Sequence, residues 1–317
     1  MKSETPAEAP LEIWHEAVVG EDEIDELGHM NVRFYFEKAW AATRALAARH
    51  GLGAEAAADQ GFRLELRDVY TRHYAEQMQG ASLVVRGGVI DVRGDGLRLY
   101  HELVNPAKDE VAATFVHEAA LRDEATGAPR PLPENAAQSV GTARVAWPEH
   151  GRPRTIDLDG PPPRPAFETL RERGLAMRHE RKIEAAACDE RGVFPVASYL
   201  DLIWGGIPIE RRENDSWLTD LEDGGKMGWA TLESRGIVFD MPRAGDCIQS
   251  FSAEVELGRK TSYRHSWAFD VVTGRLLCLH SVLNLAFDIG KRRSIEIPAN
   301  VRRGLEKRVY PDLGAAG

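Results

Sequence analysis

The chain has 317 residues, a length that allows two domains of roughly 150 residues, each with its own core. A hydrophobic content of 43% and a charged content of 28% are typical of soluble globular proteins. The net charge of −10 argues against general nucleic-acid binding, because a phosphate backbone requires a basic face. It leaves open an anionic small ligand met by a local basic cluster.

Targeting and cofactor signals are missing from the sequence. The first ten residues have no apolar core of a signal peptide, and no apolar run approaches the roughly 18 residues that span a membrane. The three cysteines show neither Cys-x-x-Cys nor zinc spacing, which favours a reducing cytoplasm. There is no P-loop, dinucleotide-binding glycine loop, Gly-x-Ser-x-Gly or His-Glu-x-x-His. We therefore expect a cytoplasmic protein with no membrane partner, no metal and no cofactor.

The elements of the first half form one helix and a run of strands. A helix is predicted over 32–50, with Asn31 as its N-cap and Gly51 and Gly53 at its end. A short, partly helical segment follows at 54–59. Alternating apolar residues and turn signals predict strands over 11–19, 62–74, 82–92, 97–104 and 111–121.

The middle of the chain, 123–166, contains nine prolines that should break any regular element, so we interpret it as a linker. From residue 178 the order of strand, turn and helix resumes. Strands are then predicted over 229–239, 246–257, 262–271 and 275–287, and the charged tail after Pro298 as a surface helix.

The turn before the first helix is the strongest candidate site. Asp25 lies six residues upstream of the Asn31 cap, so a carboxylate would face the positive end of a helix dipole. A general base beside an anion-stabilising helix end suits acyl transfer. Gly28 would allow a tight backbone turn there. The plain alternative is that Asp25 is only a turn or capping residue.

The same pattern returns later in the chain. At one offset of 164 residues, an Asp, a Glu, a Gly, a Tyr and a Trp all repeat. The matched pairs are Asp25 and Asp189, Glu26 and Glu190, Gly28 and Gly192, Tyr35 and Tyr199, and Trp40 and Trp204. Gly80 and Gly245, and Pro133 and Pro298, match at an offset of 165. A near-constant offset over more than a hundred residues indicates two copies of one unit.

The segment from Asp25 to Tyr35, Asp-Glu-Leu-Gly-His-Met-Asn-Val-Arg-Phe-Tyr, resembles the Asp-x-x-Gly-His-x-Asn-x-x-x-Tyr signature of the hotdog-fold acyl-CoA thioesterases, the 4-hydroxybenzoyl-CoA thioesterase-like superfamily. Plant acyl-ACP thioesterases keep the same spacing from Asp to His, but have an Asn where this chain has Leu27. The segment 189–195, Asp-Glu-Arg-Gly-Val-Phe-Pro, looks like the variant in small bacterial members.

The resemblance implies an α+β fold, a tandem double hotdog in which each half is a long central helix wrapped by an antiparallel β-sheet. The expected domains are a first hotdog at 11–125, a Pro-rich linker at 126–170, a second hotdog at 171–300 and a tail at 301–317. The halves should form an intramolecular pseudo-dimer with sites at their shared interface, and association into a homo-oligomer is left open.

The function that the resemblance implies is hydrolysis of an acyl-CoA thioester to the free acid and CoA. Asp25 would act as nucleophile or general base, with backbone amides from Gly28 to Asn31 as the oxyanion hole. His29 would either hydrogen-bond the Asp25 carboxylate or only cover the helix start. Asp189 is a second candidate catalytic residue, although Val193 and Pro195 stand where the first copy has His29 and Asn31.

Tyr35, Arg259, Lys260 and Ser262 are the candidate substrate-binding residues. The last three form a compact basic turn with hydroxyls that could receive CoA phosphates. Tyr35 could equally be a core residue, and Asn31 purely a cap. Two other functions remain: an acyl-CoA hydratase or dehydratase, disfavoured because its Asp-x-Asn-Pro-x-His motif is missing, and a non-catalytic acyl-thioester-binding module.

Overall fold

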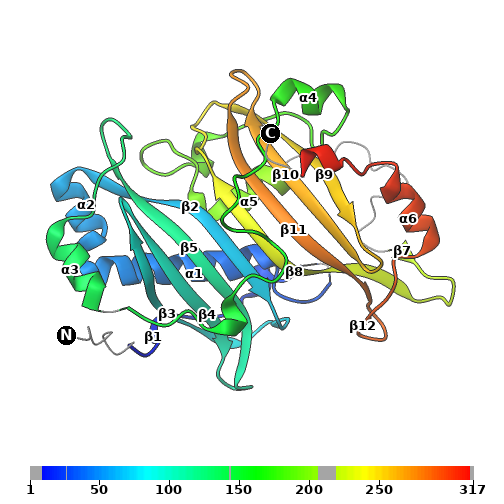
Figure 1. The fold of residues 1–317 in the computed structure, drawn as a ribbon, viewed down its shortest axis with the longest axis horizontal. Helices are drawn as coiled ribbons and strands as arrows, with labels where there is room; N and C mark the ends of the chain where they lie inside the picture. The colour runs from blue at the N-terminus through cyan, green and yellow to red at the C-terminus, as the bar shows by residue number, and fades with distance from the viewer. Residues whose placement is uncertain (1–8, 26, 143, 206–218, 315–317) are drawn as a thin grey trace, which may run out of the picture. The chain divides into compact units, whose positions relative to one another are not determined.

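A computed structural model describes residues 9–314, apart from 26, 143 and 206–218 (Figure 1). The chain divides into two compact units, of which the first ends at Arg152 and the second begins at Pro153. This boundary falls inside the proline-rich segment. Each unit consists of an antiparallel sheet and a helix that follows the first strand.

The first unit has the strand order β1-β3-β4-β5-β2, antiparallel throughout. Its elements in chain order are β1 (Glu12–Val18), η1 (Glu21–Glu23), α1 (Val32–Ala47), η2 (Ala48–Leu52), α2 (Ala54–Gln60), β2 (Phe62–His73), β3 (Ser82–Arg93), β4 (Gly96–Asn105), β5 (Glu110–Asp123), α3 (Glu134–Thr142) and η3 (Glu149–Gly151). The five strands confirm those predicted from alternation and turn signals.

Helix α1 is the central element of the first unit and lies across its sheet (Figure 1). Its buried residues recur every three or four positions, which gives one apolar face. Ala39 and Ala42 are fully buried on this face and allow a close approach to the sheet. The Thr43 hydroxyl lies between two buried histidines of the sheet, 2.8 Å from Nε2 of His101 and 2.7 Å from Nδ1 of His117.

The second unit repeats this topology strand for strand in the order β6-β9-β10-β11-β8, with β7 paired to β8 and β12 to β11. Its elements are α4 (Phe167–Glu172), β6 (Arg181–Lys182), η4 (Ala185–Ala187), η5 (Val196–Ser198), α5 (Tyr199–Trp204), β7 (Thr219–Asp220), β8 (Lys226–Val238), β9 (Cys247–Leu257), β10 (Thr261–Asp270), β11 (Leu276–Asp288), β12 (Arg293–Ser294), α6 (Ala299–Glu306) and η6 (Pro311–Leu313). Helix α5 ends at extended Gly205 and is shorter than α1. The charged tail after Pro298 does form a helix.

The proline-rich segment contains regular structure, so the prediction that its prolines break every element was wrong. Helix α3 follows Pro133, whose carbonyl accepts the Ala137 N–H at 2.9 Å. Helix α4 packs Phe167 against Phe251 at a ring distance of 5.4 Å. The prolines precede these helices rather than interrupt them, a position where their missing N–H costs nothing.

Candidate functional site

The turn before α1 presents the Asp25 carboxylate. The Asp25 N–H donates to the His29 carbonyl at 3.0 Å, and the Gly28 N–H donates to the Asp25 carbonyl at 2.9 Å. Gly28 has φ +84°, which a residue with a side chain would adopt only under strain. The Leu27 N–H holds Oδ1 of Asp25 at 2.9 Å. The carboxylate is therefore fixed by its own backbone, with about a fifth of the side chain exposed (21%).

His29 lies between two carboxylates. Its Nδ1 is 3.6 Å from Oδ2 of Asp25, and its Nε2 is 3.6 Å from Oε1 of Glu76. Glu76 comes from the connection between β2 and β3, and sequence reasoning missed it. These distances place the imidazole between the two carboxylates, and the role of His29 stays a prediction.

Tyr35 joins the connection between β2 and β3 to α1. Its hydroxyl donates to the Ala75 carbonyl at 3.0 Å and accepts the Gln77 N–H at 3.0 Å. Burial raises the pKa of Tyr35 well above its ordinary value, so the hydroxyl stays protonated. The side chain is buried, and its hydroxyl holds the backbone on both sides of Glu76; the role of Tyr35 in substrate binding stays a prediction.

The start of α1 is capped as the sequence predicted, because the Asn31 side chain accepts the Arg33 N–H at 3.1 Å. The Asn31 N–H donates to the Glu23 carbonyl at 2.9 Å, and the buried Lys38 ammonium contacts the Glu23 carboxylate at 2.5 Å. These bonds fix the turn onto the first two turns of the helix.

Most amides proposed for the oxyanion hole have internal partners. The Gly28 N–H donates to Asp25, the Met30 N–H to the Gln77 carbonyl at 2.7 Å and the Asn31 N–H to Glu23. Within the described part of the chain, the structure gives no hydrogen-bond acceptor to the N–H groups of His29 and Val32. Of the amides predicted from the sequence, that of His29 therefore remains a candidate donor, and the structure adds the Val32 amide at the positive end of α1.

The turn after Asp189 repeats the backbone geometry of the first. The Asp189 N–H donates to the Val193 carbonyl at 2.8 Å, and the Gly192 N–H donates to the Asp189 carbonyl at 2.8 Å. Gly192 also has a positive φ, +71°. Each of these bonds matches one in the first unit at the offset of 164, so the repeat seen in the sequence is a repeat of hydrogen bonds.

Both oxygens of the Asp189 carboxylate, however, accept hydrogen bonds from the same turn. Oδ1 of Asp189 accepts the N–H groups of Arg191 and Val193, both at 3.0 Å, and Oδ2 accepts the Arg191 guanidinium at 2.8 Å. Partial burial raises the pKa of Asp189, but the Arg191 contacts and the Val193 N–H outweigh it and lower the pKa below its ordinary value. The Val193 N–H, which matches the His29 N–H at the offset of 164, donates to Asp189 here.

A family model matches the first part of the chain. Residues 19–140 match the family model described as the thioesterase-like superfamily. No curated protein matches the chain.

Three solved structures resemble the chain over most of its length. The acyl-ACP thioesterase of Bacteroides thetaiotaomicron is 12% identical, with a TM-score of 0.63, over 86% of this chain and 97% of the other. The putative oleoyl thioesterase of Lactobacillus plantarum is 10% identical, with a TM-score of 0.67, over 88% and 97%. The 12:0-ACP thioesterase of Umbellularia californica is 8% identical, with a TM-score of 0.62, over 86% and 92%. These likenesses confirm the α+β tandem double-hotdog fold.

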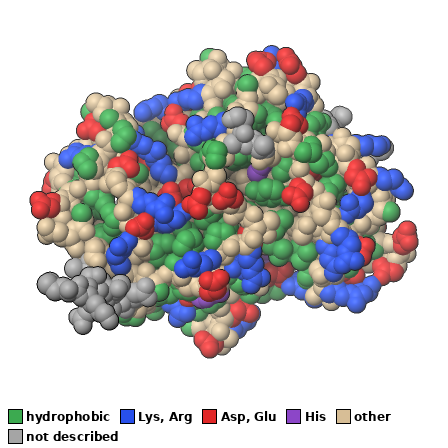
Figure 2. Space-filling view, in the orientation of Figure 1, with side chains coloured by type: hydrophobic (Ala, Val, Ile, Leu, Met, Phe, Trp, Pro, Cys, Tyr) green, Lys and Arg blue, Asp and Glu red, His purple; other side chains and the backbone are tan. Residues whose placement is uncertain are grey.

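The basic turn predicted for CoA phosphates lies outside the thioesterase-like unit, in the second unit between β9 and β10. Nη1 of Arg259 is 3.0 Å from the Glu296 carboxylate, and Nζ of Lys260 donates to the Ser294 hydroxyl at 3.1 Å. Ser262 is buried, and its hydroxyl donates to Glu254. Ser262 therefore does not join an exposed basic turn. Figure 2 shows basic and acidic side chains interleaved over the face in view.

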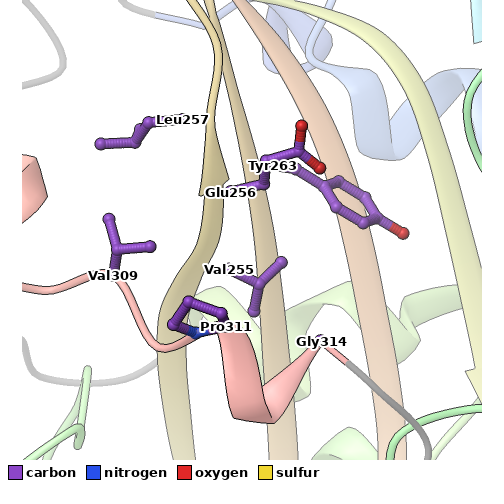
Figure 3. A pocket seen from close by; sticks show the side chains of 7 residues that line it. All are labelled: Val255, Glu256, Leu257, Tyr263, Val309, Pro311 and Gly314. Atoms are coloured by element: carbon purple, nitrogen blue, oxygen red, sulfur yellow. The ribbon is translucent and has the colours of Figure 1, made fainter.

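The second unit also carries a surface groove of about 570 Å³ between β9, β10 and the C-terminal segment (Figure 3). Its lining residues are Val255, Glu256, Leu257, Tyr263, Val309, Pro311 and Gly314. None of the predicted site residues lines it. Among the described residues, no three His, Cys, Asp or Glu side chains gather closely enough to hold a metal ion. The described part of the chain also has no helix that is both long and apolar enough to cross a membrane.

Proposed function

We propose that the protein hydrolyses an acyl thioester, with Asp25 of the thioesterase-like unit as nucleophile or general base. The observation that carries this proposal is the row formed by Asp25, His29 and Glu76 beside the open amides at the start of α1. The match of residues 19–140 to the thioesterase-like superfamily model supports the reaction class.

The chemistry needs a group that activates the attack and a place for the charge that develops. With Asp25 as base, the carboxylate takes a proton from water, the oxygen of that water bonds to the thioester carbon, and the carbon–sulfur bond breaks. The products are a carboxylic acid and a thiol. With Asp25 as nucleophile, the same bond breaks first to give an anhydride, which water then hydrolyses. In both cases the carbonyl oxygen becomes negative, and the His29 and Val32 amides are the candidate donors to it.

His29 holds the carboxylate in place during this step. Each of its ring nitrogens lies 3.6 Å from one carboxylate oxygen, so the ring stands between Asp25 and Glu76. The ring also lies where it can pass a proton toward the leaving thiolate.

Asp25 rather than Asp189 is the proposed centre. The Asp189 carboxylate accepts hydrogen bonds from Arg191 and Val193, and Pro195 stands at the position of the capping Asn31. An incoming water or carbonyl would have to displace those charge-assisted bonds.

The substrate we propose is a thioester of phosphopantetheine, either as coenzyme A or on a carrier protein. Two of the similar structures are acyl-ACP thioesterases, and the motif at Asp25 resembles that of acyl-CoA thioesterases. The shared chemistry is the thiol arm, so both forms belong in the test.

A panel of short, long and aromatic acyl-CoAs, with matching acyl-carrier proteins, tests this proposal through thiol release followed with a chromogenic thiol reagent. Release on any member of the panel supports hydrolysis. Hydrated or dehydrated acyl-CoA without thiol release would instead identify a hydratase, and binding without turnover would identify a binding module.

A further inference from the structure

Gln77 is a fully buried polar residue that belongs to none of the predicted elements. Its side-chain amide bridges the ends of two strands: Oε1 accepts the Asn105 Nδ2 at 2.7 Å, and Nε2 donates to Oε1 of Glu110 at 3.1 Å. Asn105 ends β4 and Glu110 begins β5, and the two are register partners. A buried amide with a partner on both its oxygen and its nitrogen has one orientation.

The backbone of Gln77 carries this rigidity to the candidate site. Its carbonyl accepts the Met30 N–H at 2.7 Å, and its N–H donates to the Tyr35 hydroxyl at 3.0 Å. Met30 directly follows His29, and Glu76 directly precedes Gln77. The hydrogen bond from Met30 to Gln77 joins the chain neighbours of His29 and Glu76, and it therefore sets the distance between His29 and Glu76.

We propose that Gln77 is a positioning residue for the reaction at Asp25, and this inference rests on the proposed function. Its amide fixes the connection between β2 and β3 to the β4–β5 hairpin, and its carbonyl draws the His29 turn onto that connection. Glu76 is thereby held against the imidazole, and the imidazole against Asp25. In this proposal the Gln77 amide acts through the positions of Glu76 and His29 and takes no part in the reaction.

The second unit keeps the backbone pairing without this support. The Phe194 N–H donates to the Pro242 carbonyl at 2.9 Å, as Met30 does to Gln77. Pro242 has neither an N–H for a tyrosine hydroxyl nor a side-chain amide. The polar network thus belongs to the unit that contains His29.

The first test is Gln77→Met, which keeps the side-chain length and removes both amide hydrogen bonds. We expect kcat to fall roughly ten- to a hundred-fold, with KM changed by less than about two-fold, because small misplacements in a site cost this much in rate. The loss should largely disappear in a Glu76→Gln background, since both changes act through His29. Gln249→Met is the matched control, because the Gln249 side chain lies in the second unit, where its Nε2 donates to the Arg178 carbonyl at 3.4 Å.

Equal effects of Gln77→Met in the wild-type and Glu76→Gln backgrounds would overturn the proposal, as would equal effects of Gln77→Met and Gln249→Met. If Gln77→Met does not fold, Glu110→Ala removes one partner of the amide and leaves Gln77 in place. It should give a smaller loss of kcat of the same kind, and an unchanged kcat would count against the proposal.

Hydrogen exchange at the Met30 amide separates this inference from the proposed function. Gln77→Met should speed exchange at Met30 without substrate present, because the acceptor carbonyl becomes mobile. Unchanged exchange refutes the positioning role even in an active enzyme. A wild type that releases no thiol refutes the proposed function, whatever the exchange rate at Met30.

Discussion

The pair formed by Lys38 and Glu23 is a sharp test of how the site is held together. The Lys38 side chain is 7% exposed and that of Glu23 16%, and their charged atoms lie 2.5 Å apart. Lys38→Met keeps the apolar stem and leaves the Glu23 carboxylate without its counter-ion. Breaking a buried ion pair costs about 3–5 kcal/mol. Glu23 keeps some exposure and a 3.3 Å contact with the Gly20 N–H, so the lower end of that range, ~3 kcal/mol, is expected.

For a unit of this size, that loss corresponds to a Tm lowered by roughly 6–12 °C. Differential scanning calorimetry resolves it if the transition of the first unit is followed separately from that of the second. The matched control is Arg259→Met, because the side chains of Arg259 and Glu296 are 75% and 62% exposed and such pairs contribute about 0–1 kcal/mol. Equal Tm changes for the two variants would refute the argument that burial makes the Lys38 pair important.

Three further predictions follow from the first unit. Burial lowers the pKa of His101 to about 3, so the folded unit binds fewer protons than the unfolded chain below about pH 6.5. The free energy of unfolding should therefore fall from pH 6.5 toward pH 3, by at most roughly 1.4 kcal/mol per pH unit. His101→Leu should reduce this pH dependence, measured by urea unfolding. An unchanged slope would contradict this. Asn31→Ala should cost about 1 kcal/mol through the lost cap, whereas Asn31→Ser should restore most of it. Gly28→Ala and Gly192→Ala should each cost about 1–2 kcal/mol through backbone strain, but only Gly28→Ala should reduce turnover, and equal losses of turnover would count against Asp25 as the centre.

The repeated turn could be predicted because its residues are local in sequence. Asp25, Gly28 and Asn31 lie within seven residues, and the copy at Asp189 keeps the same spacing. The strands could be predicted as well, because alternation and turn signals mark a strand within a short stretch of sequence. The Asn31 cap follows the same logic, and the structure confirms it.

The partners of that turn could not be predicted in this way. Glu76 and Gln77 reach the site through the folding of a connection some fifty residues from Asp25, and no local pattern marks them. The closure of the second turn was only partly visible: Val193 and Pro195 were noticed, but the bonds from Arg191 depend on its rotamer. Ser262 was predicted to belong to a compact basic turn, and its burial and its hydrogen bond to Glu254 depend on the neighbouring strand β9, which the local sequence does not show.

The measurement that tests the central claim most directly compares thiol release by wild type, Asp25→Asn and Asp189→Asn on the best substrate of the panel. Asn keeps the shape of the side chain and removes the base or nucleophile. The account predicts that kcat collapses by orders of magnitude in Asp25→Asn and changes little in Asp189→Asn. Collapse only in Asp189→Asn, or full turnover in Asp25→Asn, would contradict it.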